Sequence, residues 1–334
     1  MAKGRRVIPA AFFLRPFGHR SRTMPHSGFT LSFIAALTVG VLAGFSAAAA
    51  AETRVAGGDV LRRGEYLFNA AGCGNCHTDR RNKGPLLGGG PALKTRFGTF
   101  YGPNISPHRT HGIGAWSEAD FIRAMRDGVS PDGRHYYPAF PYGSFTHMTD
   151  GDLKDLRAYI FSLPPVARRS RRHDLRFPFN IRAGVWLWKA LYLERGPLAA
   201  RPGRSRQWNR GAYLVEALVH CAECHTPRTA LGGFRRRFWM AGNSEGPDGE
   251  RVPNITPDVK TGIGKWSREE IVEALEFGML PDGDEFVSPM ADVVEHGTSK
   301  LTPADRLAIA VYLKSLKAIA HIPRSKPKPG DKKK

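Results

Sequence analysis

Apolar residues recur at helical spacing in several separate stretches of this 334-residue chain. One such stretch, residues 60–71, predicts a helix with a single apolar stripe. Its members are Val60, Leu61, Gly64, Leu67, Phe68 and Ala71. A counterpart covers residues 212–218. Both predicted helices lead directly into a short segment with two cysteines and a histidine.

Helix start signals predict two further helices after each of these stretches. The capping pairs are Ser117 with Asp120, Thr149 with Asp152, Ser267 with Glu270, and Thr302 with Asp305. The expected ends are near Gly128, before Pro164, near Gly278 and near Leu316. The segments between these helices are rich in Gly, Pro and Asn, which is typical of long loops. Loops of that length need a group inside the domain to pack on.

The chain repeats itself. "PNISPHRTHGIGAWSEADF" recurs 150 residues later as "PNITPDVKTGIGKWSREEI", and "MTDGDLKDLRAYIFSL" recurs at an offset of 153 as "LTPADRLAIAVYLKSL". Because the blocks keep their order, we expect a duplicated helical domain, at residues 52–163 and 209–320. The linker, residues 164–208, is expected to hold a helix over 181–193, capped by Asn180 and packed between the domains.

The two ends of the chain differ in composition from the repeats. Residues 1–51 carry basic residues and no acidic one, and the uncharged run from Ser27 to Ala51 ends in an A-x-A pattern. This is typical of a signal peptide for export. An uncleaved N-terminal anchor is the alternative, because a run of that length can span a bilayer; Met24 is an alternative start to Met1. Residues 321–334 are expected to be a basic, disordered tail.

The formal net charge is +20, and outside the leader the excess lies in the linker and the tail. Both are expected to be solvated basic segments. An anionic membrane surface or an acidic partner is a candidate contact for "RRSRR" at 168–172. A nucleic-acid partner is not expected, since an exported chain rarely meets one.

The chain has four cysteines, in "CGNCHT" and "CAECHT". Disulfides, thiol redox chemistry and a four-cysteine zinc site are alternatives. A disulfide within each pair would be a tight redox loop without the βαβ context of thioredoxins. Zinc would leave two histidines unused beside its ligands.

C-x-x-C-H uses every residue of the motif. Two thiols add to the vinyl groups of one haem, and the adjacent imidazole reaches the iron. We therefore expect two covalently bound haems c. The tethers are Cys73, Cys76, Cys221 and Cys224, and the proximal iron ligands are His77 and His225.

Methionines are expected to supply the second axial ligands. Met148 lies in the loop before the last helix of the first repeat, and Met290 lies in "VSPMADVV" of the second. Both are far enough along the chain to reach the opposite haem face. His147 and His135 are the alternatives to Met148. The remaining methionines of the repeats, expected to be packing residues, are Met125, Met240 and Met279.

Two tryptophans occupy matching places in "GIGxW". Trp116 and Trp266 are expected either to donate their indole N–H groups to haem propionates or to be core residues bonded to backbone.

The motifs "GCGNCHT", "CAECHT", "GIGxWS", "YYPAFPYGSF" and "FPFNIR" resemble the multihaem cytochrome c subunits of periplasmic membrane-bound dehydrogenases of the alcohol, gluconate, sorbitol and fructose type. The resemblance covers residues 59–318. It implies an all-α fold of two tandem class I cytochrome c-like domains joined by a partly helical linker. Two features depart from the family: those subunits commonly carry three haem domains, and Phe140 replaces the methionine of "PAMPY".

The function expected is electron transfer, not catalysis. The chain would relay single electrons in the periplasm, from a dehydrogenase subunit to an oxidase, a quinone-linked complex or a soluble cytochrome. The alternative is a dihaem redox enzyme, peroxidase-like or thiosulfate dehydrogenase-like, which needs an open iron.

Overall fold

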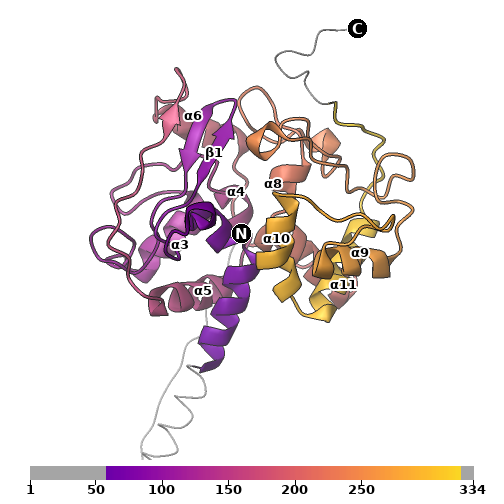
Figure 1. The fold of residues 1–334 in the computed structure, drawn as a ribbon, viewed down its shortest axis with the longest axis horizontal. Helices are drawn as coiled ribbons and strands as arrows, with labels where there is room; N and C mark the ends of the chain where they lie inside the picture. The colour runs from indigo at the N-terminus through magenta and orange to yellow at the C-terminus, as the bar shows by residue number, and fades with distance from the viewer. Residues whose placement is uncertain (1–57, 325–334) are drawn as a thin grey trace, which may run out of the picture. The chain divides into compact units, whose positions relative to one another are not determined.

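The computed structural model describes residues 58–324, which belong to one compact unit, Arg54–Lys334. The expected signal segment, residues 1–51, lies outside the described residues, as does most of the expected tail. We call residues 58–163 the first half and residues 206–324 the second half (Figure 1). None of the helices within residues 58–324 has the length and apolar character needed to cross a membrane.

The described chain is mainly helical. After a helix through residues 58–70, the first half contains α2 (Cys73–His77), η1 (Arg80–Asn82), α3 (Glu118–Asp127), α4 (Tyr142–Phe145) and α5 (Asp150–Ser162). The linker contributes α6 (Gly184–Tyr192). The second half contains α7 (Arg206–Tyr213), the π-helical η2 (Leu214–Leu218), α8 (Ala222–His225), η3 (Arg236–Phe238), η4 (Pro247–Gly249), α9 (Arg268–Phe277), α10 (Met290–His296), η5 (Thr298–Lys300) and α11 (Pro303–Lys314).

The predicted caps are confirmed. The Ser117 hydroxyl accepts a hydrogen bond from the Asp120 N–H at the start of α3, and Ser267 does the same with Glu270 at the start of α9. Both helices end at a left-handed glycine, Gly128 or Gly278. Threonine hydroxyls cap α5 and α11 in the same way. The cap signals therefore located four helix starts.

One predicted apolar stripe and two predicted helix starts are corrected. Val60 and Leu61 are 36% and 40% exposed, so the first two members of the predicted apolar stripe face outward. The helix expected at 212–218 begins earlier, because Ser205 caps α7 by accepting from the Trp208 N–H. The linker helix begins at Gly184, because Asn180 lies in a turn before it and caps no helix.

A small sheet modifies the all-α expectation. β1 (Ala92–Thr95), β2 (Gly98–Tyr101) and β3 (Asp174–Leu175) form an antiparallel sheet in the order β1-β2-β3. A Cβ at Gly98 would lie 2.3 Å from the Asp174 carbonyl oxygen, so only glycine allows β3 to approach this closely. The third strand comes from the linker, which is thereby attached to the first half.

In each half the first and last helices cross at a glycine. A Cβ at Gly64 would lie 2.2 Å from the Asp155 carbonyl oxygen of α5, and one at Gly211 would lie 2.0 Å from the Ala308 carbonyl oxygen of α11. The missing side chains let the helix backbones touch, and buried apolar residues such as Leu67, Leu214 and Ile309 fill the space around the crossings.

The linker helix α6 contacts both halves. The Lys189 ammonium donates to the carbonyl oxygens of Asp127 and Gly128, at 2.5 and 2.8 Å, where α3 ends. In the second half, Gly233 packs against the ring of Tyr192, also from α6. A Cβ at Gly233 would lie 2.3 Å from this ring.

Candidate functional site

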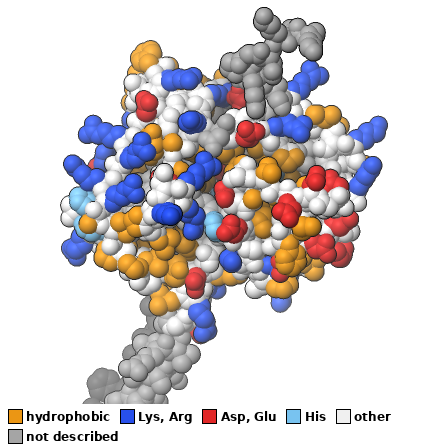
Figure 2. Space-filling model, in the orientation of Figure 1, with side chains coloured by type: hydrophobic (Ala, Val, Ile, Leu, Met, Phe, Trp, Pro, Cys, Tyr) orange, Lys and Arg blue, Asp and Glu red, His pale blue; other side chains and the backbone are white. Residues whose placement is uncertain are grey.

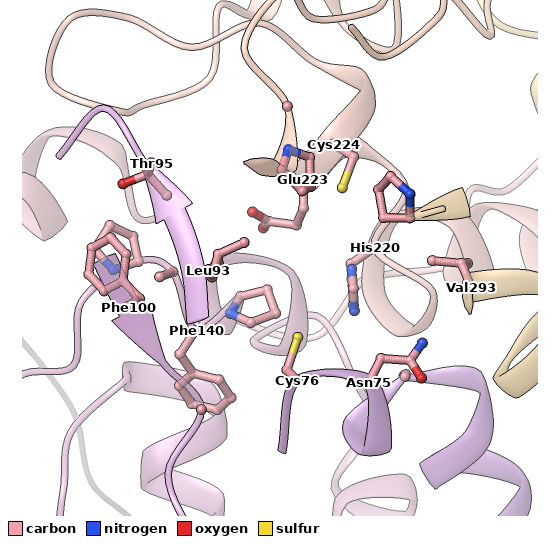
Figure 3. A pocket seen from close by; sticks show the side chains of 18 of the residues that line it. Asn75, Cys76, Leu93, Thr95, Phe100, Phe140, His220, Glu223, Cys224 and Val293 are labelled. Carbon is pink, nitrogen blue, oxygen red and sulfur yellow. The ribbon is translucent and has the colours of Figure 1, made fainter. Parts of the chain in front are cut away.

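Both cysteine motifs open into one cavity of about 3530 Å³ (Figure 3). Its lining includes Cys73, Cys76, His77, Cys221, Cys224 and His225. Figure 3 shows Cys76 and Cys224 on opposite walls, with Glu223 and His220 between them. Ordinary small-molecule sites occupy about 300–1,000 Å³. The cavity therefore has room for more than one bound group of that size.

Close backbone packing fixes the first motif. A Cβ at Gly90 or Gly102 would lie 1.8 or 1.7 Å from the Cys76 carbonyl oxygen, so both positions require glycine. The Gly90 N–H donates to the Gly102 carbonyl, and the Gly89 N–H donates to the His77 carbonyl. These bonds hold the C-terminal end of α2 and orient the histidine that ends it.

Each motif histidine is held through the same ring nitrogen. His77 Nδ1–H donates to the Pro103 carbonyl at 2.8 Å, and His225 Nδ1–H donates to the Pro253 carbonyl at 2.9 Å. Because a carbonyl only accepts, Nδ1 carries the proton and Nε2 has a free lone pair. Burial lowers the pKa of both imidazoles, which favours the neutral form that binds metals.

The four cysteines are free thiols in the described chain. Burial raises the pKa of the Cys73, Cys221 and Cys224 thiols to about 12, and it also raises the pKa of Cys76. Reactive redox thiols have lowered pKa values, so these do not resemble a thioredoxin-type pair. Within residues 58–324 no group of three or more His, Cys, Asp or Glu side chains is placed to hold a metal ion, so the two cysteine pairs do not assemble into a zinc site.

The structure places the two predicted axial methionines differently. Met290 begins α10 and lines the cavity. Met148 is fully buried in the hydrophobic core and is not among the lining residues. Met125, expected to be a packing residue, lines the cavity in the first half. Fully buried Met240 and 40%-exposed Met279 do not line it.

Trp116 and Trp266 both line the cavity. Their backbone groups are bonded: the Trp116 N–H donates to Ile113 and the Trp266 N–H donates to Ile263. Within residues 58–324 neither indole N–H donates a hydrogen bond, which leaves both groups available to a bound acceptor.

Sequence reasoning missed the linker's part in this site. Trp188 of α6 lines the cavity, and its buried Nε1–H has no acceptor within the described residues. The β1–β2 hairpin also contributes to the lining, through residues such as Leu93 and Phe100. The aromatic residues of the linker predicted that its helix packs against the protein. Their spacing does not specify which surface the helix covers.

The donor set fits a covalently attached haem. Each motif brings two thiols and one imidazole, with a free Nε2 lone pair, to the wall of a large cavity, and apolar and aromatic side chains surround them. His77 and His225 would be iron ligands, and the four cysteines would be the thioether tethers.

Comparisons with known proteins agree with this chemistry. The family model for cytochrome c matches residues 61–164. The chain is 46% identical over 266 residues to the diheme cytochrome c-type protein of Cereibacter sphaeroides, covering 77% of this chain and 86% of that protein. It is 41% identical over 262 residues to the fructose dehydrogenase cytochrome subunit of Gluconobacter japonicus, covering 78% of this chain and 53% of the subunit.

A third relative is the gluconate 2-dehydrogenase cytochrome c subunit of Pantoea cypripedii, 37% identical over 294 residues, or 85% of this chain and 65% of the subunit. The chain thus spans roughly half to two thirds of these dehydrogenase subunits and most of the diheme protein. It belongs to the cytochrome c family, whose cofactor is covalently bound haem c, within the group of diheme c-type cytochromes and cytochrome subunits of dehydrogenases.

Proposed function

We propose that the chain binds two haems c, one at each motif, and relays single electrons between them. One observation carries the proposal: Cys76 and Cys224, from the two motifs, face each other across one cavity. An iron with two fixed axial ligands exchanges one electron without exchanging ligands. The protein's contribution is to hold both sites at a fixed separation.

The proposal includes two tandem class I cytochrome c-like domains joined by the linker. Matching elements support it: a first helix, a cysteine motif and two capped helices occur in the same order in both halves. The matching hydrogen bonds from His77 and His225 support it further, since they prepare the same ligand atom twice.

We propose Met148 and Met290 as the second axial ligands. The cavity position of Met290 supports its role. For the first site, the cavity position of Met125 favours testing it beside Met148. Trp116 and Trp266 are proposed to donate to propionates. Their position in the cavity lining supports this, as does the lack of an acceptor for either indole N–H among residues 58–324.

The proposed setting is the periplasm, with a membrane-bound dehydrogenase as electron donor and a respiratory component as acceptor. The similarity to the cytochrome subunits of fructose dehydrogenase and gluconate 2-dehydrogenase supports the donor. The acceptor classes are an oxidase, a quinone-linked complex and a soluble cytochrome. A contact of the basic linker with anionic membrane is part of the same proposal, supported by its arginines at 168–172.

The test is haem stoichiometry with visible spectroscopy, after expression with a cytochrome c maturation system. We expect two haems per chain, both low-spin, reversibly reducible and inert to carbon monoxide. C73A/C76A and C221A/C224A variants should each retain one. A parent chain with one haem or none contradicts the proposal.

A dihaem redox enzyme is the second candidate, and the absence of Met148 from the cavity lining is the observation that favours it. In that case one iron has an open position. A high-spin haem that binds carbon monoxide, together with peroxide or thiosulfate turnover, would select this candidate over the relay.

A further inference from the structure

The second half exposes an apolar patch beside the candidate site. Phe277 is 67% exposed, Met279 40% and Val287 80%. They lie where α9 ends and in the loop after it, which is closed by the hydrogen bond from the Phe286 N–H to the Gly278 carbonyl. We call these three residues the apolar patch. Exposed large apolar groups gathered in one place are typical of interaction sites.

Acidic residues surround the apolar patch. Residues 269–299 contain nine Asp and Glu and no Lys or Arg. Figure 2 shows acidic side chains gathered over the region where Figure 1 places α9 and α10. Glu276 pairs with Arg306 at 2.6 Å. The acidic ring, as we call the exposed residues Glu273, Asp282, Asp284 and Glu285, has no ion-pair partner within residues 58–324. Its negative charge is therefore available to a partner.

The first half carries the opposite charge at equivalent positions. At the 150-residue offset, Arg123, Arg126 and Arg134 correspond to Glu273, Glu276 and Asp284. Helices α3 and α9 share their length, capping box and terminal glycine, so the backbone is the same while three charges are reversed. Within the acidic ring, Glu273 and Asp284 thus correspond to arginines of the first half, Glu285 corresponds to His135, and only Asp282 keeps an acidic counterpart, Asp132.

The equivalent surface of the first half is already occupied by the linker. Tyr137, the counterpart of Val287, donates to the Asn180 carbonyl at 3.3 Å, and the Arg182 guanidinium lies 4.6 Å from its ring centroid. Arg182 also donates to the carbonyl of His135, the counterpart of Glu285, at 2.7 Å. The occupant there is a linker segment that places a basic side chain, Arg182, over an aromatic ring. Within residues 58–324 no such segment covers Val287.

The patch adjoins the candidate haem site. Glu285, Val287 and the proposed ligand Met290 all line the same cavity. A protein seated on the apolar patch would therefore lie next to the second site, where an electron could leave.

We propose that the apolar patch and acidic ring dock a cationic electron-transfer protein whose Lys and Arg side chains surround an apolar contact, an inference that rests on the proposed electron relay. Because the acidic ring is negatively charged, its partner should carry positive charge. The contacts of the linker on the equivalent surface of the first half indicate the same combination of a basic side chain with a ring surface. One electron passes from the reduced chain to the oxidised partner, and no proton or ligand is exchanged.

The test is a stopped-flow measurement with the reduced full-length protein and a strongly cationic single-haem cytochrome c as oxidant. The variant E273Q/D282N/D284N/E285Q removes the acidic ring. The variant D59N/E65Q/E118Q/D132N makes the same change in net charge on exposed residues of the first half and is the matched control. The lysine-acetylated form of the same oxidant is the second control.

At low ionic strength we expect the acidic-ring variant to lose at least about tenfold in second-order rate constant and most of its salt dependence. The matched control should change less than about twofold. V287S should slow transfer while leaving the salt dependence unchanged. Equal rates and salt slopes for parent, acidic-ring variant and matched control would overturn the docking proposal.

Haem content and reduction by dithionite separate this result from a failure of the relay itself. If the parent carries two haems, is reduced by dithionite and delivers electrons to the oxidant, then unchanged rates in the acidic-ring variant reject only the docking surface. If the parent carries no haem or cannot be reduced, both proposals fail.

Discussion

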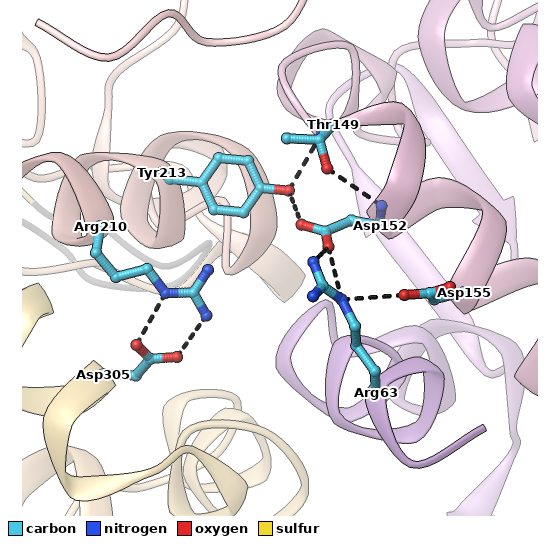
Figure 4. Close-up of polar contacts among 7 residues, drawn as sticks. All are labelled: Arg63, Thr149, Asp152, Asp155, Arg210, Tyr213 and Asp305. Atoms are coloured by element: carbon cyan, nitrogen blue, oxygen red, sulfur yellow. Dashed lines mark hydrogen bonds and ion pairs between the residues drawn. The ribbon is translucent and has the colours of Figure 1, made fainter. Parts of the chain in front are cut away.

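The phenol of Tyr66 donates to the Asp305 carboxylate of the other half at 2.6 Å. In the reverse direction, Tyr213 donates to Asp152, as Figure 4 shows. Each carboxylate also binds an arginine of its own half; Arg210, for example, donates to Asp305 at 2.8 and 2.6 Å. Burial raises the pKa of both tyrosines, and their hydrogen bonds to the carboxylates raise it further, so both remain donors. The two halves are therefore joined by a reciprocal pair of charge-assisted hydrogen bonds.

Removing either phenol should weaken the association of the halves. Y66F and Y213F each delete one hydrogen bond to a carboxylate, which costs about 1.5–3 kcal/mol in the free energy of unfolding. Guanidinium unfolding of the haem-loaded protein measures the change. Y159F is the matched control, because Tyr159 donates to Glu65 on the surface at 3.4 Å and should cost well under about 1 kcal/mol. Equal losses in all three variants would contradict an inter-half role.

Asp305 should make the free energy of unfolding depend on pH in the acidic range. Burial alone would raise its pKa, but the hydrogen bonds from Arg210 and Tyr66 lower it below its usual 3.8. Its contribution to the unfolding free energy is thus fully present above the unfolded value and is lost as the pH falls through the folded pKa. D305N should be less stable than the parent by about 2 kcal/mol at pH 7. The difference should shrink below about pH 4; a constant difference across this range would refute the assignment.

Lys189 should make the free energy of unfolding depend on pH in the alkaline range. Burial, then repulsion from Arg195, lowers its pKa to about 8 from 10.5. Between these two values the unfolded chain binds more protons, so the parent's unfolding free energy should rise with pH, by at most about 1.4 kcal/mol per unit. K189R stays charged and should lack the rise. Chemical unfolding of both proteins from pH 7 to 11 checks this; parallel curves would mean that Lys189 titrates normally.

Single replacements of methionines should identify the axial ligands. M290A should convert the second haem to a ligand-binding form and lower its reduction potential, because a thioether ligand favours the reduced iron. M148A should do the same at the first haem, and M125A, which alters a cavity wall, should leave the spectrum low-spin. Carbon monoxide binding and spectroelectrochemistry provide the readouts.

The reverse result is also informative for the first haem. If M125A allows carbon monoxide to bind and M148A leaves the spectrum unchanged, the ligand is the cavity-lining Met125. No response from either variant would direct attention to His147 and His135, the alternatives that the sequence offers.

The capped helices and the cysteine motifs could be predicted from the sequence because their signals are local. Ser117 and Thr302 cap helices through residues only three positions away. The π-helical turn at η2, the third strand and the reciprocal tyrosines depend on partners distant in the chain. Tyr66 and Asp305 are separated by 239 positions, and no periodicity relates them. The neighbours of Met148 were unpredictable for the same reason, since it lies in a hydrophobic core built from residues distant in the chain.

The reciprocal contacts of Tyr66 and Tyr213 have the pattern of an isologous interface, in which each copy offers the same donor to the same acceptor of the other. A homodimer of one such unit must carry every surface charge twice. With both units in one polypeptide, Arg123 and Glu273 occupy equivalent places with opposite signs. Joining the two halves in one polypeptide therefore combines reciprocal contacts inside with different surface charges outside, so the two sides of the molecule differ as those of a symmetric pair cannot.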